Sequence, residues 1–481
     1  MPALEPRLFH DNQTNRKMTM NNRPDTQREF LKTLGLGLGA SAALRSAPAL
    51  LAQAPGDRPP RGDQIKVLNP RDRVPVAMII DDSTCLVNVN HFAVPQFAEA
   101  WGGKPYTHNW REWPREIPDS FVRKFGSWCA EQGVKGKYSI VPYPACVGRL
   151  DRGLPGWSQK ELRESLDLVR TLMMPHWDIH PEMVTHTRVI DLKTGHPYED
   201  HSLKFMENWE WTTGRSTDEI ADYLAYALRI LKNVGLPCEG ITTPGGFGTR
   251  ALPQLAQATL QSVRDVFKAE IPHYFRHLYD KGDASVAPRV EYASGLQSPD
   301  PRCVVSIIAC TGDWTGGWDN TPPGGADKFI SQDLQSGRLV EIIKRGEPAL
   351  MLAHWTGMFF NGEEVGFNIF KEVVRRLNER RDPIIWMKLS EVSRYWAAKE
   401  LTTLQSSSNG AEVRLSAPFA CKDFTVSLPK RAVRLEAQGH VTPLQEIASR
   451  QGLRSGTWHN AGTSTLVCLD LPRGESKLVL G

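Results

Sequence analysis

The sequence predicts an α/β fold in which a (β/α) barrel is followed by a small β-rich domain, and three observations support this prediction. Short apolar runs alternate with segments of helical period from about residue 70 to residue 400, which is the pattern of a parallel sheet with crossover helices. A region of this length is typical of a sheet that closes into a barrel. From about residue 401 the pattern changes to short alternating runs separated by turn residues.

The elements are identified in chain order by their period and their end signals. The first strand is the apolar run Val76–Ile80, which is typical of a strand buried on both faces. Ser216 and Glu219 form a capping box in front of a helix that runs to about Val234. Further strands are predicted at 136–141, 177–179, 240–242, 304–309, 349–353 and 383–387. Further helices are predicted at 120–132, 158–173, 252–268, 328–344, 367–378 and from residue 390 onward.

The first 54 residues have the order of parts of a bacterial signal peptide. The charged segment Arg28–Lys32 precedes the apolar run Leu34–Leu44, and Ala52-Gln53-Ala54 supplies a small-residue cleavage site. Thr26–Lys32 resembles the twin-arginine signal with Gln27 in place of the first arginine, so this route and the general export route are both open. We therefore expect a periplasmic or secreted protein with a signal peptide at 1–54, a linker at 55–69, a barrel domain at 70–400 and a β-rich domain at 401–481.

The charge balance argues against nucleic acid as a partner. Lys and Arg total 58 against 54 Asp and Glu, and the net charge of +4 is not gathered into a basic run. Residues 1–54 carry three of these four net charges, so the mature chain would carry +1. No segment after the signal reaches the roughly 20 apolar residues of a membrane span. We therefore expect no stable membrane insertion once the signal is cleaved.

Polar side chains follow several of the predicted strands at their carboxyl ends, which is where parallel α/β folds place their active sites. Asp81 and Asp82 follow the first strand, and His354 follows the strand 349–353. The others are His180, Glu182 and His186 after 177–179, the segment Thr242–Gly246 after 240–242, and Asp313 after 304–309. Carboxylates, imidazoles and a glycine loop on one rim are the components of a divalent-metal hydrolytic site.

Two of these groups bring the chemistry of a metal site. Asp81 and Asp82 are neighbours at a strand end, where a turn of the chain lets one carboxylate bind metal while the other acts as a base. Glu182 and His186 are four residues apart, so a helical turn would place both side chains on one face at the spacing of two ligands. His180 could replace Glu182 as the ligand if that turn stays open.

As a set, these segments resemble the motifs of the polysaccharide deacetylase family of carbohydrate esterases over about residues 70–398. Val76–Ser83 is similar to the motif in which an apolar strand ends in Thr-Phe-Asp-Asp-Gly. Asp178–His186 is similar to Glu-Ile-Gly-x-His-Thr-x-x-His, with Glu182 where the family has its first metal-binding histidine. Thr242–Gly246 resembles Arg-x-Pro-Tyr/Gly-Gly with the arginine replaced, and Leu350–His354 resembles the strand that ends in a catalytic histidine.

The resemblance implies a fold and a cofactor. The fold would be a distorted (β/α) barrel of the polysaccharide deacetylase type, followed here by the small C-terminal β-rich domain. The cofactor would be a divalent metal, either zinc or another first-row transition metal. Asp82, His186 and either Glu182 or His180 would hold that metal.

The resemblance also implies the catalytic roles. Asp81 would be the general base, and His354 would protonate the leaving amine or alkoxide. The backbone at Thr243, Pro244 and Gly245 would help to hold the oxyanion.

The sequence thus predicts an exported metal-dependent hydrolase that acts on carbohydrate, by N- or O-deacetylation of a polysaccharide or oligosaccharide. Indole faces stack on sugar rings, and many of the 14 tryptophans fall in loops or at element ends. We expect Asp313, Trp355 and Asn361 to line the cleft. The tryptophans of this kind are Trp110, Trp113, Trp157, Trp177, Trp209, Trp211, Trp314, Trp318 and Trp355.

Two other functions fit the same residues. One is a glycoside hydrolase on the same barrel, in which Asp81 and either Glu182 or Asp313 form an acid/base pair without metal. The other is a non-catalytic carbohydrate-binding protein that uses the tryptophans alone.

Overall fold

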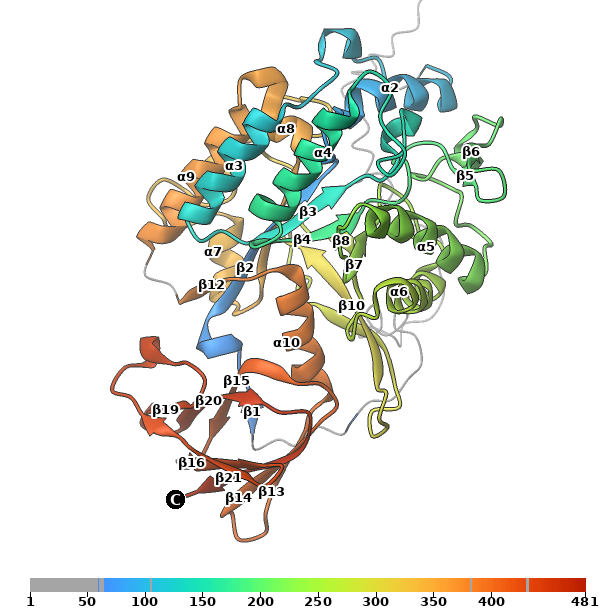
Figure 1. Ribbon diagram of the computed structural model, residues 1–481. Coiled ribbons are helices and arrows are strands. Elements are labelled where there is room, and N and C mark those ends of the chain that lie inside the picture. The colour runs from blue at the N-terminus through green and yellow to red at the C-terminus, as the bar shows by residue number, and fades with distance from the viewer. Residues whose placement is uncertain (1–58, 60–64, 104–105, 381–382, 430–431) are drawn as a thin grey trace, which may run out of the picture. The chain divides into compact units, whose positions relative to one another are not determined.

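The computed structural model describes residues 59, 65–103, 106–380, 383–429 and 432–481 (Figure 1). The predicted signal peptide, 1–54, lies outside the described residues. Among the helices that the structure describes, we find none with the length and apolar character that a membrane crossing requires.

The predicted alternation of strands and helices gives a mixed α/β fold with two sheets of mostly parallel strands (Figure 1). The first sheet has the order β11 (Ala349–His354), β2 (Val74–Asp81), β3 (Gly136–Ile140) and β4 (Trp177–Pro181), with β12 (Ile384–Trp386) paired to the start of β2. The second has the order β7 (Gly240–Thr242), β8 (His273–Leu278), β10 (Arg302–Ala309) and β9 (Arg289–Ser294), of which β9 is antiparallel. A separate hairpin joins β5 (Ile190–Asp191) and β6 (His196–Pro197).

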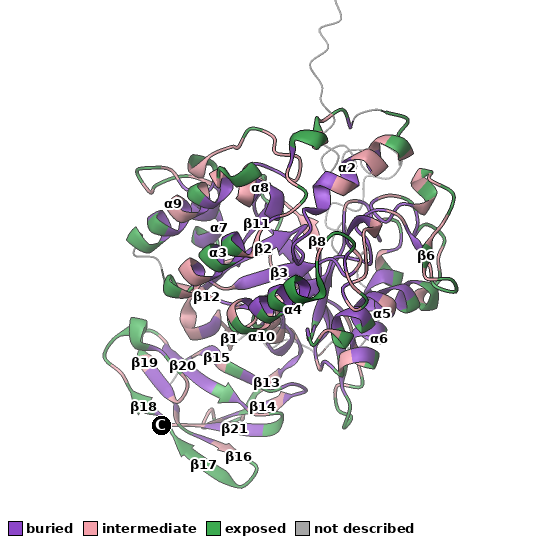
Figure 2. Ribbon diagram, turned by 45° about the horizontal axis from the view of Figure 1, so that its top comes forward, coloured by how far each residue is buried: buried purple, intermediate pink, exposed green. Residues whose placement is uncertain are grey.

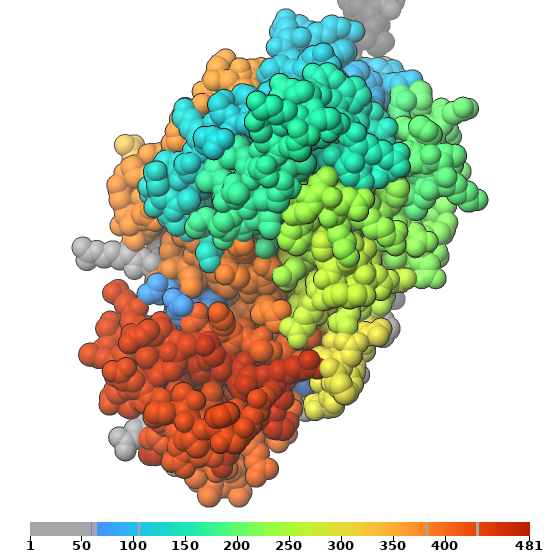
Figure 3. Space-filling model, viewed as in Figure 1, coloured from blue at the N-terminus to red at the C-terminus, as the bar shows by residue number. Residues whose placement is uncertain are grey.

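Helices cover the outer faces of these sheets, with exposed outer sides and buried inner sides (Figure 2). In the space-filling view, cyan-to-green residues cover much of this face above the orange-to-red C-terminal region (Figure 3). The helix Val89–Ala100 was not predicted, and the prediction at 328–344 is too long because only Arg338–Lys344 is α-helical. The helices are α2 (Val89–Ala100), α3 (Asp119–Glu131), α4 (Gln159–Leu168), α5 (Thr217–Asn233), α6 (Leu252–Phe267), α7 (Arg338–Lys344), α8 (Trp355–Phe359), α9 (Val365–Glu379) and α10 (Leu389–Leu401).

The predicted closure into a barrel is not observed as continuous strand pairing among the described residues. The two sheets meet on one side through an isolated bridge between Glu182 and Thr242. On the other side the Cys310 N–H donates to the Leu350 carbonyl at 2.8 Å. The physical reason is local: β7 has three residues, and β4 ends at Pro181, which has no N–H to offer to a neighbouring strand.

The strand β2 determines which residues face the interior between the sheets. All eight of its residues are buried, and the side chains alternate between two faces. Val76, Met78 and Ile80 pack toward the helices, whereas Ala77 and Ile79 belong to an interior apolar cluster. Asp81 continues the interior face by the same period of two. The carboxyl end of β2 therefore presents a carboxylate at the top of a packed interior.

The C-terminal region consists of two five-stranded sheets. One has the order β1 (Lys66–Val67), β15 (Cys421–Leu428), β20 (Thr465–Leu471), β19 (Thr457–Asn460) and β18 (Gln445–Glu446). The other has the order β13 (Thr403–Ser406), β14 (Glu412–Ala417), β21 (Gly474–Leu480), β16 (Ala432–Ala437) and β17 (His440–Pro443). Because β1 pairs with β15, the region predicted as a linker, 55–69, contributes a strand to the first of these sheets.

Candidate metal and hydrolytic site

The structure brings Asp82, Glu182 and His186 together at the carboxyl ends of β2 and β4. The Nε2 atom of His186 lies 2.7 Å from Oδ1 of Asp82 and 3.4 Å from Oε1 of Glu182. The exposed fractions of the three residues are 1%, 2% and 6% in chain order. A donor set of one nitrogen and two carboxylate oxygens, all buried, is characteristic of a metal site.

The backbone around this group is irregular, and the segment from Glu182 to His186 does not form the helical turn that would place both side chains on one face. The segment bends instead, with left-handed φ values of 52° at Met183 and 63° at His186. Asp82 is also left-handed, at φ 60°, so the chain turns sharply after β2. A left-handed conformation is unfavourable by roughly 1–2 kcal/mol for a residue with a Cβ. Contacts elsewhere must therefore hold these residues in place.

Glu207 supplies those contacts for the loop that carries His186. Its carboxylate accepts hydrogen bonds from the backbone N–H groups of Val184, Thr185 and His186, and from the hydroxyl of Tyr223. Burial raises the pKa of Glu207 to about 7, although these donors act in the opposite direction. The sequence offered no signal for this residue, because it lies in an irregular segment between predicted elements.

The free atoms of the group fit a divalent metal. Oδ2 of Asp82 accepts from Nδ2 of Asn90 at 2.9 Å, and Oε2 of Glu182 accepts from the backbone N–H of Asp82 at 2.8 Å. The other oxygen of each carboxylate faces His186. Oδ1 of Asp82 is a buried acceptor that receives no well-formed hydrogen bond among the described residues. Ligands that share a zinc ion lie about 2.0–2.2 Å from it, so donor atoms 2.7 and 3.4 Å apart need little movement to share one.

His180, the predicted alternative ligand, belongs to a different group with Asp178 and His273. Its Nε2 lies 2.9 Å from Nε2 of His273, and burial lowers the pKa of both imidazoles, that of His273 to about 4. The reason is the strand period: side chains two residues apart on β4 are about 6–7 Å apart along the strand. Oε2 of Glu182 accepts from the Asp82 N–H, whereas His180, two residues earlier and level with Ser139, contacts His273 instead.

Asp81 and His354 stand side by side on paired strands, because the register of β2 and β11 aligns them. Nδ1 of His354 lies 2.6 Å from Oδ2 of Asp313. Burial disfavours the charged imidazole, but the carboxylates of Asp313 and Asp82 outweigh it and raise the pKa of His354 to about 10. Asp313, predicted to line the cleft, is therefore the residue that orients His354.

Lys137 of β3 is a further member of the site that the sequence did not reveal. Its side chain is fully buried, and its ammonium forms a short ion pair with Asp81. Burial still raises the pKa of Asp81 to about 7, against the positive charge of Lys137. A lysine inside a strand carries no signal in a search of strand ends.

The remaining residues predicted to contact substrate differ in their burial and in their hydrogen bonds. Thr243 is not free to hold an oxyanion, since its N–H and its hydroxyl both donate to the Phe275 carbonyl at 3.1 Å. Pro244 is buried and Gly245 has a left-handed φ of 43°, close to the Asn208 carbonyl. Asn361 is exposed, and its Oδ1 accepts from Asn320 at 3.0 Å.

Trp355 does not line the cleft, contrary to the prediction. It is the first residue of α8, is fully buried, and packs against Phe121, Phe125 and Tyr138 at ring-centroid distances of 4.8, 5.1 and 5.3 Å. The helix that begins directly after His354 turns this side chain back into the core. Trp177 and Trp211 are buried core residues as well.

An aromatic cluster does lie beside Asp82, Glu182 and His186. Phe97 of α2 is 6.3 Å from the ring of His186, 5.2 Å from Trp209 and 6.2 Å from Trp318. Trp101, 40% exposed, extends the cluster outward through a ring contact of 5.7 Å with Trp209. Trp209 and Trp318, which the sequence placed in loops, therefore lie close to the candidate ligand His186.

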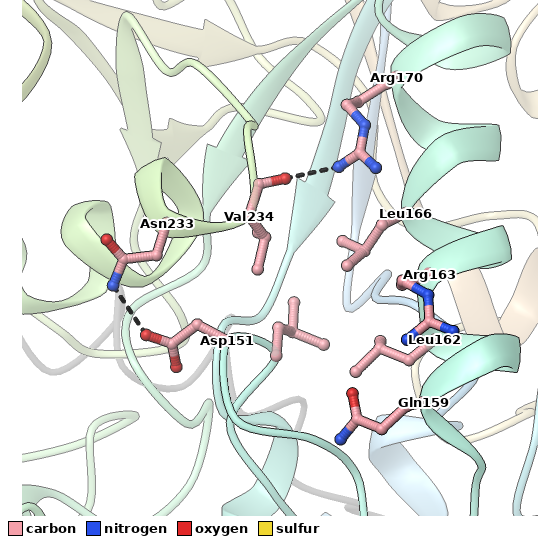
Figure 4. Close-up of a pocket in the computed structure, with 9 residues that line it drawn as sticks. Asp151, Gln159, Leu162, Arg163, Leu166, Arg170, Asn233 and Val234 are labelled. Atoms are coloured by element: carbon pink, nitrogen blue, oxygen red, sulfur yellow. Dashed lines mark hydrogen bonds between the residues drawn. The ribbon is translucent and has the colours of Figure 1, made fainter.

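A surface recess of about 370 Å³ lies elsewhere, beside α4 and the end of α5 (Figure 4). Two pairs of its polar groups are engaged with each other: Arg170 donates to the Val234 carbonyl, and Asp151 accepts from Asn233. None of the predicted site residues lines it.

Comparisons with known proteins give distant likenesses. No family model matches the chain, and no curated protein matches it. A solved structure described as a probable polysaccharide deacetylase from Pseudomonas aeruginosa PAO1 is similar with a TM-score of 0.30 and 11% identity, covering 49% of this chain. The chain spans 64% of the length of that protein.

A second solved structure is the catalytic domain of GH30 xylanase C from Talaromyces cellulolyticus. The TM-score is 0.22 and the identity 9%, over 87% of this chain and 100% of that one. Neither TM-score is high enough to assign a function to this chain.

Proposed function

We propose that the chain is a metal-dependent hydrolase that removes acyl groups from carbohydrate, by N- or O-deacetylation. The observation that carries the proposal is the meeting of the buried donor set Asp82, Glu182 and His186 with Asp81 and His354 at the ends of three parallel strands. A bound divalent metal supplies a Lewis acid for the acyl carbonyl and lowers the pKa of water.

The side chains around that metal then divide the proton transfers. Asp81 accepts the proton of the attacking water through the carboxylate oxygen that Lys137 does not hold. His354 keeps a proton, because Asp313 stabilises its charged form, and delivers it to the leaving amine or alkoxide. Asp82, Glu182 and His186 would hold the metal and take no part in proton transfer.

The aromatic cluster supports carbohydrate as the substrate. Trp209 and Trp318 flank Phe97 next to His186, and Trp101 presents an exposed indole at the edge of the same cluster. Apolar sugar faces stack on such rings. The proposed sugar would therefore lie across the indoles with its acyl group toward the metal.

Metal analysis combined with an activity panel tests the proposal. We expect one divalent metal per purified chain, acetate release from acetylated xylan or chitooligosaccharides, loss of that activity on chelation, and recovery with Zn²⁺ or Co²⁺. Reducing sugar released at an unchanged rate after chelation would instead identify a glycoside hydrolase. Sugar binding without either activity would identify a binding protein.

We also propose that the chain is exported to the periplasm or secreted, on the strength of the signal-like order of parts in residues 1–54. Expression of the full chain in a bacterial host, followed by N-terminal sequencing of the periplasmic fraction, tests this. We expect a mature chain that begins after Ala54. Recovery of only the uncleaved chain from the cytoplasm would contradict it.

A further inference from the structure

Lys137 occupies an unusual position for a lysine. It is aligned with Ile79 in the register of β2 and β3, so its side chain points into the interior between the sheets, and it is completely buried. Its ammonium donates to Asp81 Oδ1, to the Ile80 carbonyl at 2.9 Å and to the Ser139 hydroxyl at 2.6 Å. An ammonium has three N–H donors, and here three acceptors meet them. A lysine so engaged is a fixed cation and not a nucleophile.

The positive charge of Lys137 compensates part of the negative charge that is buried in the site. Three carboxylates, those of Asp81, Asp82 and Glu182, are buried within one group of residues. Asp82 and Glu182 both face His186, whereas the ion pair of Asp81 is with Lys137. A buried carboxylate without a compensating charge is strongly unfavourable. The ammonium of Lys137 is the cation that contacts Asp81.

Asp81 and Asp82 carry the same functional group, so any difference in their roles must come from the residues that contact them. Asp82 is held by Asn90 and faces His186, whereas Asp81 is held through Oδ1 by Lys137. The described residues give Oδ2 of Asp81 no hydrogen bond that would occupy it. We propose that Lys137 is the positioning residue that fixes the Asp81 carboxylate and keeps Oδ2 free to accept the proton of water. This inference rests on the proposed hydrolytic function.

A double-mutant cycle of Lys137→Met and Asp81→Asn separates this role from simple packing. Metal content and thermal unfolding are measured first, because neither needs a substrate. We expect every variant to keep one metal per chain, Lys137→Met to lower the melting temperature, and the double variant to recover part of that loss. Lys135→Met is the matched control, because Lys135 contacts the exposed Glu391 and should leave metal, melting temperature and activity nearly unchanged.

Kinetics with 4-nitrophenyl acetate as the probe complete the cycle. We expect Lys137→Met to lower kcat by about 100-fold, in the range of a lost general base, with KM changed less than about twofold. In the Asp81→Asn background the same change should alter kcat by less than about twofold, because Lys137 acts through Asp81. Independent, multiplicative losses would overturn the inference, and so would an unchanged kcat in Lys137→Met.

Two further outcomes are informative. If Lys137→Met does not fold, recovery of soluble protein in the double variant supports charge compensation of Asp81, whereas its absence assigns Lys137 a separate structural role and overturns the inference. If Asp81→Asn retains full activity, the proposed base is wrong, and the failure belongs to the proposed function. A loss in Asp81→Asn without one in Lys137→Met places the failure on Lys137 alone.

Discussion

Replacing Asp82 with alanine should remove the metal from the chain and lower turnover by about 1,000-fold. Oδ1 of Asp82 is the carboxylate oxygen nearest to His186 Nε2, at 2.7 Å, and it is buried without a well-formed hydrogen bond. A Lewis acid contributes several kcal/mol to transition-state stabilisation, and each 1.36 kcal/mol corresponds to a factor of ten in rate. Metal content by mass spectrometry and kcat on an acetylated substrate are the measurements.

The structure offers a matched control for this prediction. Asp178 belongs to the second group of possible ligands, with His180 and His273. Its two oxygens already accept from the backbone N–H and the hydroxyl of Ser390, at 2.6 and 2.9 Å. Asp178→Asn should therefore keep one metal per chain. If Asp82→Ala keeps its metal while Asp178→Asn loses it, the metal lies in the second group and the proposed mechanism is wrong.

The strand ends could be located from the sequence because the apolar runs that form buried strands are a local feature of the chain. The apolar run Val76–Ile80 is long enough to be buried on both faces, and it lies within the observed strand Val74–Asp81. Parallel strands share one carboxyl edge, so residues as distant as Asp82, His186 and His354 were expected near one another. The structure does place Asp82 against His186, and Asp81 beside His354.

Residues whose position depends on register or on loop geometry could not be found in this way. Lys137 lies inside a strand, and its contact with Asp81 follows from the pairing of β2 with β3, which a single sequence does not determine. Glu207 lies in a loop without period. Trp355 is adjacent to His354 in sequence, but the helix α8 begins there and reverses the direction of its side chain. His180 was a candidate because the predicted strand ended at residue 179. The observed strand β4 continues to Pro181, so His180 lies inside it.

Replacing Glu207 with alanine should destabilise the chain by about 3 kcal/mol or more and weaken metal binding by about 10–100-fold. The change would leave the N–H groups of Val184, Thr185 and His186 buried without an acceptor, and each such group is unfavourable by about 1–3 kcal/mol. The same N–H groups hold His186 in its left-handed conformation. Loss of a group that orients a ligand typically weakens metal affinity by this factor. Urea unfolding and metal titration measure the two effects.

Measuring both stability and metal affinity shows whether Glu207 positions His186 or only stabilises the fold. Glu207→Gln keeps one acceptor oxygen, so it should lie between the wild type and Glu207→Ala in both measurements. Glu210→Ala is the matched control, because Glu210 is an exposed carboxylate three residues further along the same segment. A chain that loses stability in Glu207→Ala but binds metal as tightly as the Glu210→Ala control would show that the loop does not position His186. In that case the metal would have to be held by residues other than His186, since a ligand on a released loop cannot keep its affinity unchanged.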